Sequence, residues 1–121
     1  MKLWTGIVTE KIQESKAFYT RLFGCEVVFE SDWFVLLQLG ESELGFMLPE
    51  LDTQASIFRP TFQGQGVWVA IDVENVDEEY QRIKGMNEDI TVEIRDEPWG
   101  DRHFVLRDPN GIGVDVVQHA K

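Results

Sequence analysis

The amino-acid sequence predicts an α+β fold made of two tandem modules, each with the order strand–helix–strand–strand–strand. The same order of elements occurs twice along the chain, each predicted helix is followed by a glycine, and short apolar segments separated by turn residues follow each helix. We expect the modules to form a curved mixed sheet around a cavity, with the helices on the outer face. The expected boundaries within a single domain of residues 1–121 are module one at about 1–50, a linker at 51–65 and module two at 66–121.

The first module begins with a strand at residues 3–9, in which Leu3 and Ile7 are expected to face the helix. Residues 12–23 carry apolar side chains at helical spacing, and Gly24 follows where a left-handed helix end favours glycine. Three short strands are expected next, at residues 25–30, 33–39 and 43–48.

The second module begins with a strand at residues 67–73, whose odd-numbered residues, Val67 included, are all apolar and suit the helix side. Asn75 is the expected helix N-cap, with Glu78 three residues later as in a capping box, and Gly85 is expected to end the helix. Three strands follow, at residues 90–94, 103–107 and 113–118, and the last two are joined by the turn sequence Asp108-Pro109-Asn110-Gly111.

The composition limits the classes of partner. Acidic residues outnumber basic ones 22 to 11, giving a formal charge of −11, so we expect no nucleic-acid partner. The same charge favours a cationic ligand, although surface acid also serves solubility. No apolar run approaches the roughly 20 residues of a membrane span, so no membrane partner is expected. The N-terminus lacks a signal-peptide core and the lone Cys25 cannot form an internal disulfide, so we expect a cytoplasmic protein.

Strand alternation assigns several polar and aromatic residues to the face of each sheet that lies away from the helices, here called the second face. Trp4, Trp68, Asp72, His103 and Asp115 all fall on it. This mixture of large aromatic residues and a few charges indicates a partly wet cavity for a small molecule. A dimer interface or an exposed sheet remains the alternative.

Four segments resemble one family. They are residues 15–19 (SKAFY), 22–24 (LFG), 97–104 (EPWGDRHF) and 107–111 (RDPNG). With the duplicated order of elements, they resemble the vicinal oxygen chelate superfamily, which includes glyoxalase I, extradiol dioxygenases and bleomycin-resistance proteins. The resemblance covers essentially the whole chain and implies the fold without implying one reaction.

Enzymes of this family hold a divalent metal with His, Gln or Glu from the second faces of four strands. The resemblance puts those positions at Trp4, Trp68, Gly45 or Met47, and Asp115. Indoles do not bind hard or borderline cations, and one carboxylate does not hold such a cation alone. We therefore expect no metal and no other cofactor.

His103 leaves two chemical alternatives open. With Asp115 or Asp101 it could form an acid/base pair, and with Asp115 and Asp72 it could form a different metal site. The other interpretation is that His103 orients a ligand or satisfies a buried polar group. We assign no catalytic residue, and an enzymatic role remains open. His119 is set aside because it lies close to the C-terminus.

The aromatic residues favour a planar ligand, because indole faces stack on flat molecules and attract cations. Metal-free, bleomycin-resistance-like members of the resembled family bind planar cationic drugs, usually as dimers, which implies a homodimer and a role in antibiotic resistance. The loop at 57–62 is a candidate lid or swapped arm. The residues expected to contact the ligand are Trp4, Trp33, Met47, Trp68, Asp72, Trp99, His103 and Asp115.

Three functional hypotheses follow. The first is a protein that sequesters a small planar or cationic compound without metal. The second is a metal-dependent lyase or dioxygenase of the same superfamily with a divergent site. The third is a dimeric interaction module whose cavity no longer binds a ligand.

Overall fold

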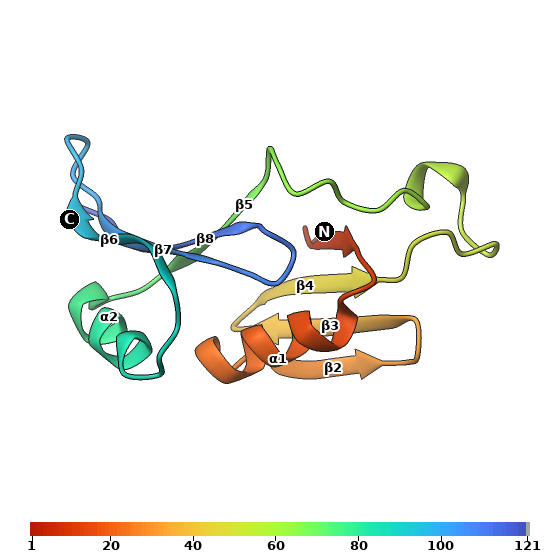
Figure 1. Ribbon diagram of the computed structural model, residues 1–121, viewed down its shortest axis with the longest axis horizontal. Coiled ribbons are helices and arrows are strands. Elements are labelled where there is room, and N and C mark those ends of the chain that lie inside the picture. Colours follow the sequence, from red (N-terminus) through yellow and green to blue (C-terminus); the bar gives the residue numbers. More distant parts are fainter. Residues whose placement is uncertain (121) are drawn as a thin grey trace. The chain divides into compact units, whose positions relative to one another are not determined.

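The computed structural model describes residues 1–120. The chain divides into two compact units, Met1–Gln63 and Gly64–Lys121, and each is described by itself. Each unit contains one helix and one four-stranded mixed sheet in the predicted order, so the prediction of an α+β fold with two tandem βαβββ modules is confirmed (Figure 1). A single domain and a cavity enclosed by both modules stay predictions.

The first unit has the sheet order β1-β4-β3-β2. Strand β1 is parallel to β4, and the other neighbouring pairs are antiparallel. The elements are β1 (Thr5–Val8), α1 (Ile12–Phe23), β2 (Glu26–Glu30), β3 (Phe34–Leu39), β4 (Ser42–Met47) and, in the segment after the sheet, the short 3₁₀ helix η1 (Ser56–Phe58).

Helix α1 has the predicted bounds because its apolar positions and its end signal agree. Gly24 follows it in the left-handed conformation, with φ of 69°, and donates its backbone N–H to the carbonyl oxygen of Thr20 at 3.1 Å. The apolar stripe of α1 packs on one face of the sheet. Its core residues and those of the sheet are Ile12, Phe18, Tyr19, Leu22, Val35, Leu37 and Phe46.

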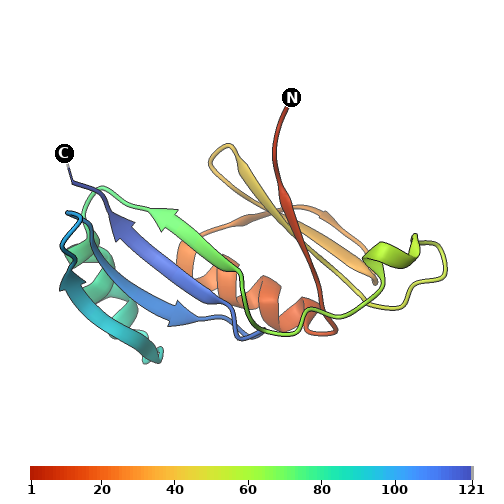
Figure 2. The same ribbon diagram turned by 90° about the horizontal axis from the view of Figure 1, so that it is seen from above.

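The second unit repeats this topology with the order β5-β8-β7-β6. Figure 2 shows its four strands side by side, with α2 on one face. The elements are β5 (Trp68–Asp72), α2 (Val76–Lys84), β6 (Ile90–Asp96), β7 (Arg102–Arg107) and β8 (Gly113–Gln118).

Helix α2 begins as the capping pattern predicts. The side chain of Asn75 accepts a hydrogen bond from the backbone N–H of Glu78 at 3.2 Å. The helix ends at Gly85, which is right-handed, and the left-handed residue follows at Asn87 with φ of 59°. The buried side chains between helix and sheet are Val76, Tyr80, Ile83, Phe104, Leu106, Val114 and Val116.

The turn between β7 and β8 is fixed by the buried Asp108, which is 4% exposed. Its Oδ1 accepts hydrogen bonds from the backbone N–H groups of Asn110 at 2.8 Å and Ile112 at 2.9 Å. Gly111 has φ of 82° and donates its N–H to the Asp108 carbonyl oxygen at 3.0 Å. The predicted turn therefore aligns β8 beside β7.

Two residues expected on the helix side are exposed instead. Leu3 is 89% exposed and Val67 is 46% exposed, and each precedes its strand. Pairing of the parallel edge strands begins only at Thr5 opposite Leu44 and at Trp68 opposite Gly113. Alternation therefore assigned a face to residues that lie beyond the paired sheet. None of the helices in residues 1–120 is long and apolar enough to cross a membrane.

Replacing Asn75 with Ala should destabilise the protein by about 1 kcal/mol, because the substitution removes the acceptor that caps α2. Urea unfolding followed by circular dichroism measures this change. Asn75→Ser is the matched control and should retain most of the stability. Equal stability of the Ala and Ser variants would contradict the capping role.

Candidate functional site

Strand pairing in the second unit confirms the predicted second face. Ala70 lies opposite Asp115, and Val117 lies opposite both Asp72 and His103. Directly paired residues point to the same side of a sheet. Four predicted ligand residues therefore share the face away from α2: Trp68, Asp72, His103 and Asp115.

His103 bridges two carboxylates on this face. Its Nδ1 lies 2.6 Å from Asp115 Oδ1, and its Nε2 lies 2.7 Å from Glu97 Oε2. Glu97 also accepts a hydrogen bond from Arg95 Nε at 2.7 Å. A carboxylate only accepts hydrogen bonds, so both ring nitrogens must carry protons. With both carboxylates ionised, this arrangement favours the imidazolium form of His103.

The electrostatics agree with a charged His103. Burial, the largest single influence on its pKa, opposes the cation, but the hydrogen bonds to Glu97 and Asp115 outweigh it and raise the pKa above its usual 6.5. Arg95 first, and His103 second, lower the pKa of Glu97. With both nitrogens donating, His103 has no lone pair for a base or a metal ligand unless the bridge opens.

His119 forms a second bridge of the same kind. Its Nδ1 lies 2.9 Å from Asp101 Oδ1, and its Nε2 lies 2.9 Å from Asp72 Oδ1. Asp101 Oδ2 also accepts a hydrogen bond from Trp99 Nε1 at 3.0 Å. Asp101, which the sequence offered as a partner of His103, is thus hydrogen-bonded to His119.

The sequence contained a signal for His119 that the prediction did not use. His119 continues the alternation of Asp115 and Val117 by one step, which puts it on the second face although it lies beyond β8. Glu97 had no such signal, because it lies in the turn after β6 and reaches His103 through the path of that turn.

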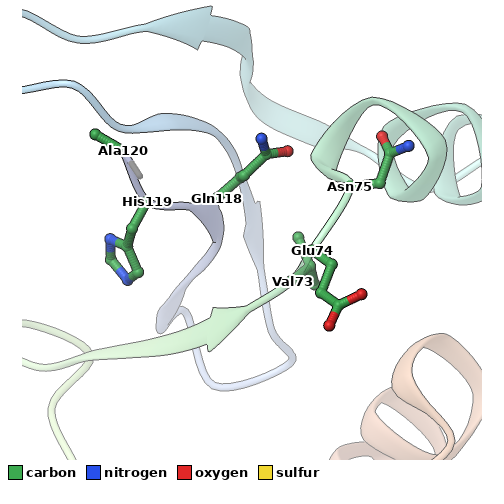
Figure 3. Close-up of a pocket in the computed structure, with 6 residues that line it drawn as sticks. All are labelled: Val73, Glu74, Asn75, Gln118, His119 and Ala120. Carbon is green, nitrogen blue, oxygen red and sulfur yellow. The ribbon is translucent and has the colours of Figure 1, made fainter.

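A hollow of about 640 Å³ lies beside His119 at the ends of β5 and β8 (Figure 3). Figure 3 shows Gln118 pointing toward the start of α2, where its Oε1 accepts a hydrogen bond from the Val76 N–H at 3.0 Å, and His119 pointing the other way. The lining residues are Val73, Glu74, Asn75, Gln118, His119 and Ala120. None of the predicted ligand residues lines this hollow.

The first unit carries an aromatic cluster, defined as Trp4, Phe29, Trp33 and Phe34. The Phe34 ring is its centre, with ring centroids 6.3 Å from Trp4, 5.8 Å from Trp33 and 6.0 Å from Phe29. Phe34 also lies opposite Met47 in the sheet. The structure therefore brings three predicted ligand residues, Trp4, Trp33 and Met47, around a phenylalanine that the prediction missed.

Two paired glycines make room for the Trp4 ring. Gly6 lies opposite Gly45 in the parallel pair β1 and β4. A Cβ atom at Gly45 would lie 3.0 Å from a Trp4 ring carbon and 3.1 Å from a Phe34 ring carbon, and one at Gly6 would lie 3.8 Å from Trp4. The indole thus rests over a floor of backbone, with 47% of Trp4 exposed.

The residues at the resembled metal positions do not fit a metal. Trp4 and Trp68 offer only an N–H donor, and Asp115 is paired with His103. Within residues 1–120 no group of three or more His, Cys, Asp or Glu side chains is arranged to hold a metal ion. The alternative set also fails to converge, because Asp72 is bonded to His119 whereas Asp115 is bonded to His103.

The family model of the Glyoxalase/Bleomycin resistance protein/Dioxygenase superfamily matches residues 3–116. This match covers nearly the whole chain, and the chain belongs to that superfamily. The family includes proteins of several activities, so membership does not by itself select one. No curated protein matches the chain.

Solved structures share the fold at low sequence identity. Lactoylglutathione lyase from Agrobacterium tumefaciens is 23% identical, with a TM-score of 0.79 over 97% of this chain and 92% of that one. A glyoxalase/bleomycin resistance protein/dioxygenase from Nocardioides is 19% identical, with a TM-score of 0.81 over 100% and 85%. TioX from Micromonospora sp. ML1 is 20% identical, with a TM-score of 0.73 over 100% and 98%.

Replacing Glu97 with Gln should lower the pKa of His103, because one of the two carboxylates that stabilise its cation is lost. Titration of the imidazole signals by NMR measures the pKa directly. Asp96→Asn is the control, since Asp96 pairs with Arg102 and should leave the His103 pKa unchanged. A His103 pKa that is the same in the wild type and in Glu97→Gln would contradict the bridge.

Proposed function

We propose that this protein binds a planar organic molecule, with a preference for cations, and sequesters it stoichiometrically without a metal. The observation that carries the proposal is the Trp4 indole laid over Gly6 and Gly45 beside Phe34. This position is one at which the resembled metal enzymes have a ligand. A ligand at this position would be held by stacking on the Trp4 indole and not by coordination to a metal.

The aromatic cluster suits stacking because its rings are supported from below and open to solvent. Trp4 is 47% exposed and Phe29 is 53% exposed, so a flat molecule can cover them. Aromatic pairs contribute about 0.5–1.5 kcal/mol beyond area burial. The glycine floor and the edge contact with Phe34 restrict the indole before the ligand arrives, which reduces the entropy lost on binding.

A preference for cations has separate support. The chain has a formal charge of −11, and the second face of the second unit carries Trp68, which is 71% exposed, beside acidic side chains. An exposed indole face attracts a cation by about 0.5–1 kcal/mol. Asp115 is paired with His103 and Asp72 with His119, so the net negative charge of the chain supports this preference more than either carboxylate does.

The remaining parts of the proposal concern assembly and context. We expect a homodimer in the cytoplasm, and a planar cationic drug is one ligand class that fits. The exposed Ile57 and Phe58 of η1 offer apolar area for a second copy. No metal-dependent lyase or dioxygenase activity is proposed, because the residues at the metal positions lack the donors for it.

Titration with proflavine, a planar cation, should quench tryptophan fluorescence saturably, and calorimetry should give one dissociation constant. Trp4→Ala should weaken binding roughly 2- to 13-fold, which corresponds to the loss of about 0.5–1.5 kcal/mol of stacking. Leu39→Ala is the matched control, because Leu39 is 37% exposed on the face opposite the cluster. The planar anion 9-anthracenecarboxylate should bind more weakly than proflavine.

The proposal is wrong if proflavine shows no saturable binding at high micromolar concentration, or if Trp4→Ala and Leu39→Ala bind it equally. Size-exclusion chromatography of both variants distinguishes this proposal from the hypothesis of a dimeric interaction module. That hypothesis predicts a changed oligomeric state in Trp4→Ala together with no probe affinity in the wild type.

A further inference from the structure

Trp99 lies in the turn between β6 and β7. In sequence it is flanked by Glu97 and Asp101, and each of these carboxylates contacts a histidine. Glu97 donates its backbone N–H to the Asp101 carbonyl oxygen at 2.8 Å, which closes the turn. Glu97 is bound by His103 and Asp101 by His119. Trp99 is 67% exposed, yet its indole N–H is tied to Asp101.

We infer that His119 is a positioning residue for Trp99: its doubly protonated ring joins Asp101 in the turn to Asp72 at the end of β5, and so fixes the indole at the edge of the second face. Trp99 was predicted to stack on a ligand, but no residue was predicted to hold it in place. The effect on ligand affinity rests on the proposed function, whereas the positioning itself does not.

The backbone supports this coupling independently of charge. Gly100 has φ of 103°, and a Cβ atom there would lie 2.8 Å from the Cβ of Ala120. The turn is therefore packed directly against the residue that follows His119. A side chain at position 100 would therefore clash with Ala120, so the turn and the C-terminal segment are in close contact.

The bridge depends on pH in a defined direction. The hydrogen bond to Asp101, and then that to Asp72, raise the pKa of His119 above 6.5, whereas desolvation opposes them. His119, and to a lesser extent Trp99, keep Asp101 ionised by lowering its pKa. The bridge is thus complete below pH 6.5 and opens as pH rises through the raised pKa of His119, because a neutral ring has one donor for two carboxylates.

Other charged groups near the bridge do not replace His119. Glu74 lines the same hollow and adds negative charge, which also favours the cation. His103 acts on Asp101 through space only, and Arg102 is engaged by Asp77 and Asp96. Among the described residues, His119 is thus the cation that donates hydrogen bonds to both Asp101 and Asp72.

The test follows the indole N–H signal of Trp99 by two-dimensional NMR on the full chain, from about pH 5.5 to about pH 9, where histidine titrates. The signal is assigned by its loss in Trp99→Phe. In the wild type it should shift with the same midpoint as the ring signals of His119, because the Asp101 contact changes as the bridge opens. The His103 ring signals, followed in the same samples, identify any contribution from that residue.

Two variants decide the assignment. His119→Arg keeps a cation with several donors that does not titrate in this range, so the Trp99 signal should stay at its low-pH position. His119→Asn should hold the signal near its high-pH position throughout. The inference is overturned if the Trp99 signal in the wild type does not shift with the His119 titration. It is also overturned if the signal shifts in both variants with the same midpoint as in the wild type.

Measuring proflavine affinity as a function of pH tests this inference separately from the proposed function. If proflavine binds, its affinity for the wild type should fall as His119 titrates, and its affinity for His119→Arg should be independent of that titration. Proflavine that does not bind removes the proposed function but leaves the NMR result to decide the positioning role. If the affinity of His119→Arg for proflavine depends on pH in the same way as that of the wild type, His119 has no role in binding.

Discussion

The parallel pairing of the first strand with the last strand in each module sets the rest of the structure. Pairing of β1 with β4, and of β5 with β8, puts these strands side by side and requires the intervening helix to cross one face. The other face is left for side chains at alternate positions. This register puts the Trp4 ring next to Gly45 and puts Trp68 and Asp115 on the same face of the second sheet.

The two units use the same frame for different chemistry. In the first, Gly6 and Gly45 leave room for aromatic rings close to the backbone of the paired strands. In the second, each histidine neutralises part of a pair of carboxylates, so acidic residues lie close together without strong repulsion. The first unit therefore presents an apolar aromatic surface, and the second presents a polar surface on which histidines are paired with carboxylates.

The elements were predictable because local signals agreed with one another. The bounds of α1, the cap of α2 and the faces of β7 and β8 all followed from periodicity, Gly24 and Asn75. The partners of the site residues were not predictable, because they depend on turn geometry and rotamers. Phe34 is the centre of its cluster only once β3 pairs with β4, and Glu97 reaches His103 only through its turn. Leu3 and Val67 show that alternation fails where pairing stops.

Calorimetric titration of chelator-treated protein with Zn²⁺ and Ni²⁺ tests whether Trp4 and Trp68 stand in place of a metal site. Imidazole and carboxylate ligands would favour these ions if the donors converged. We expect no saturable one-to-one binding of either ion in the micromolar range. Tight one-to-one binding that is lost in Asp115→Asn would contradict this expectation, because Asp115 would then be a metal ligand.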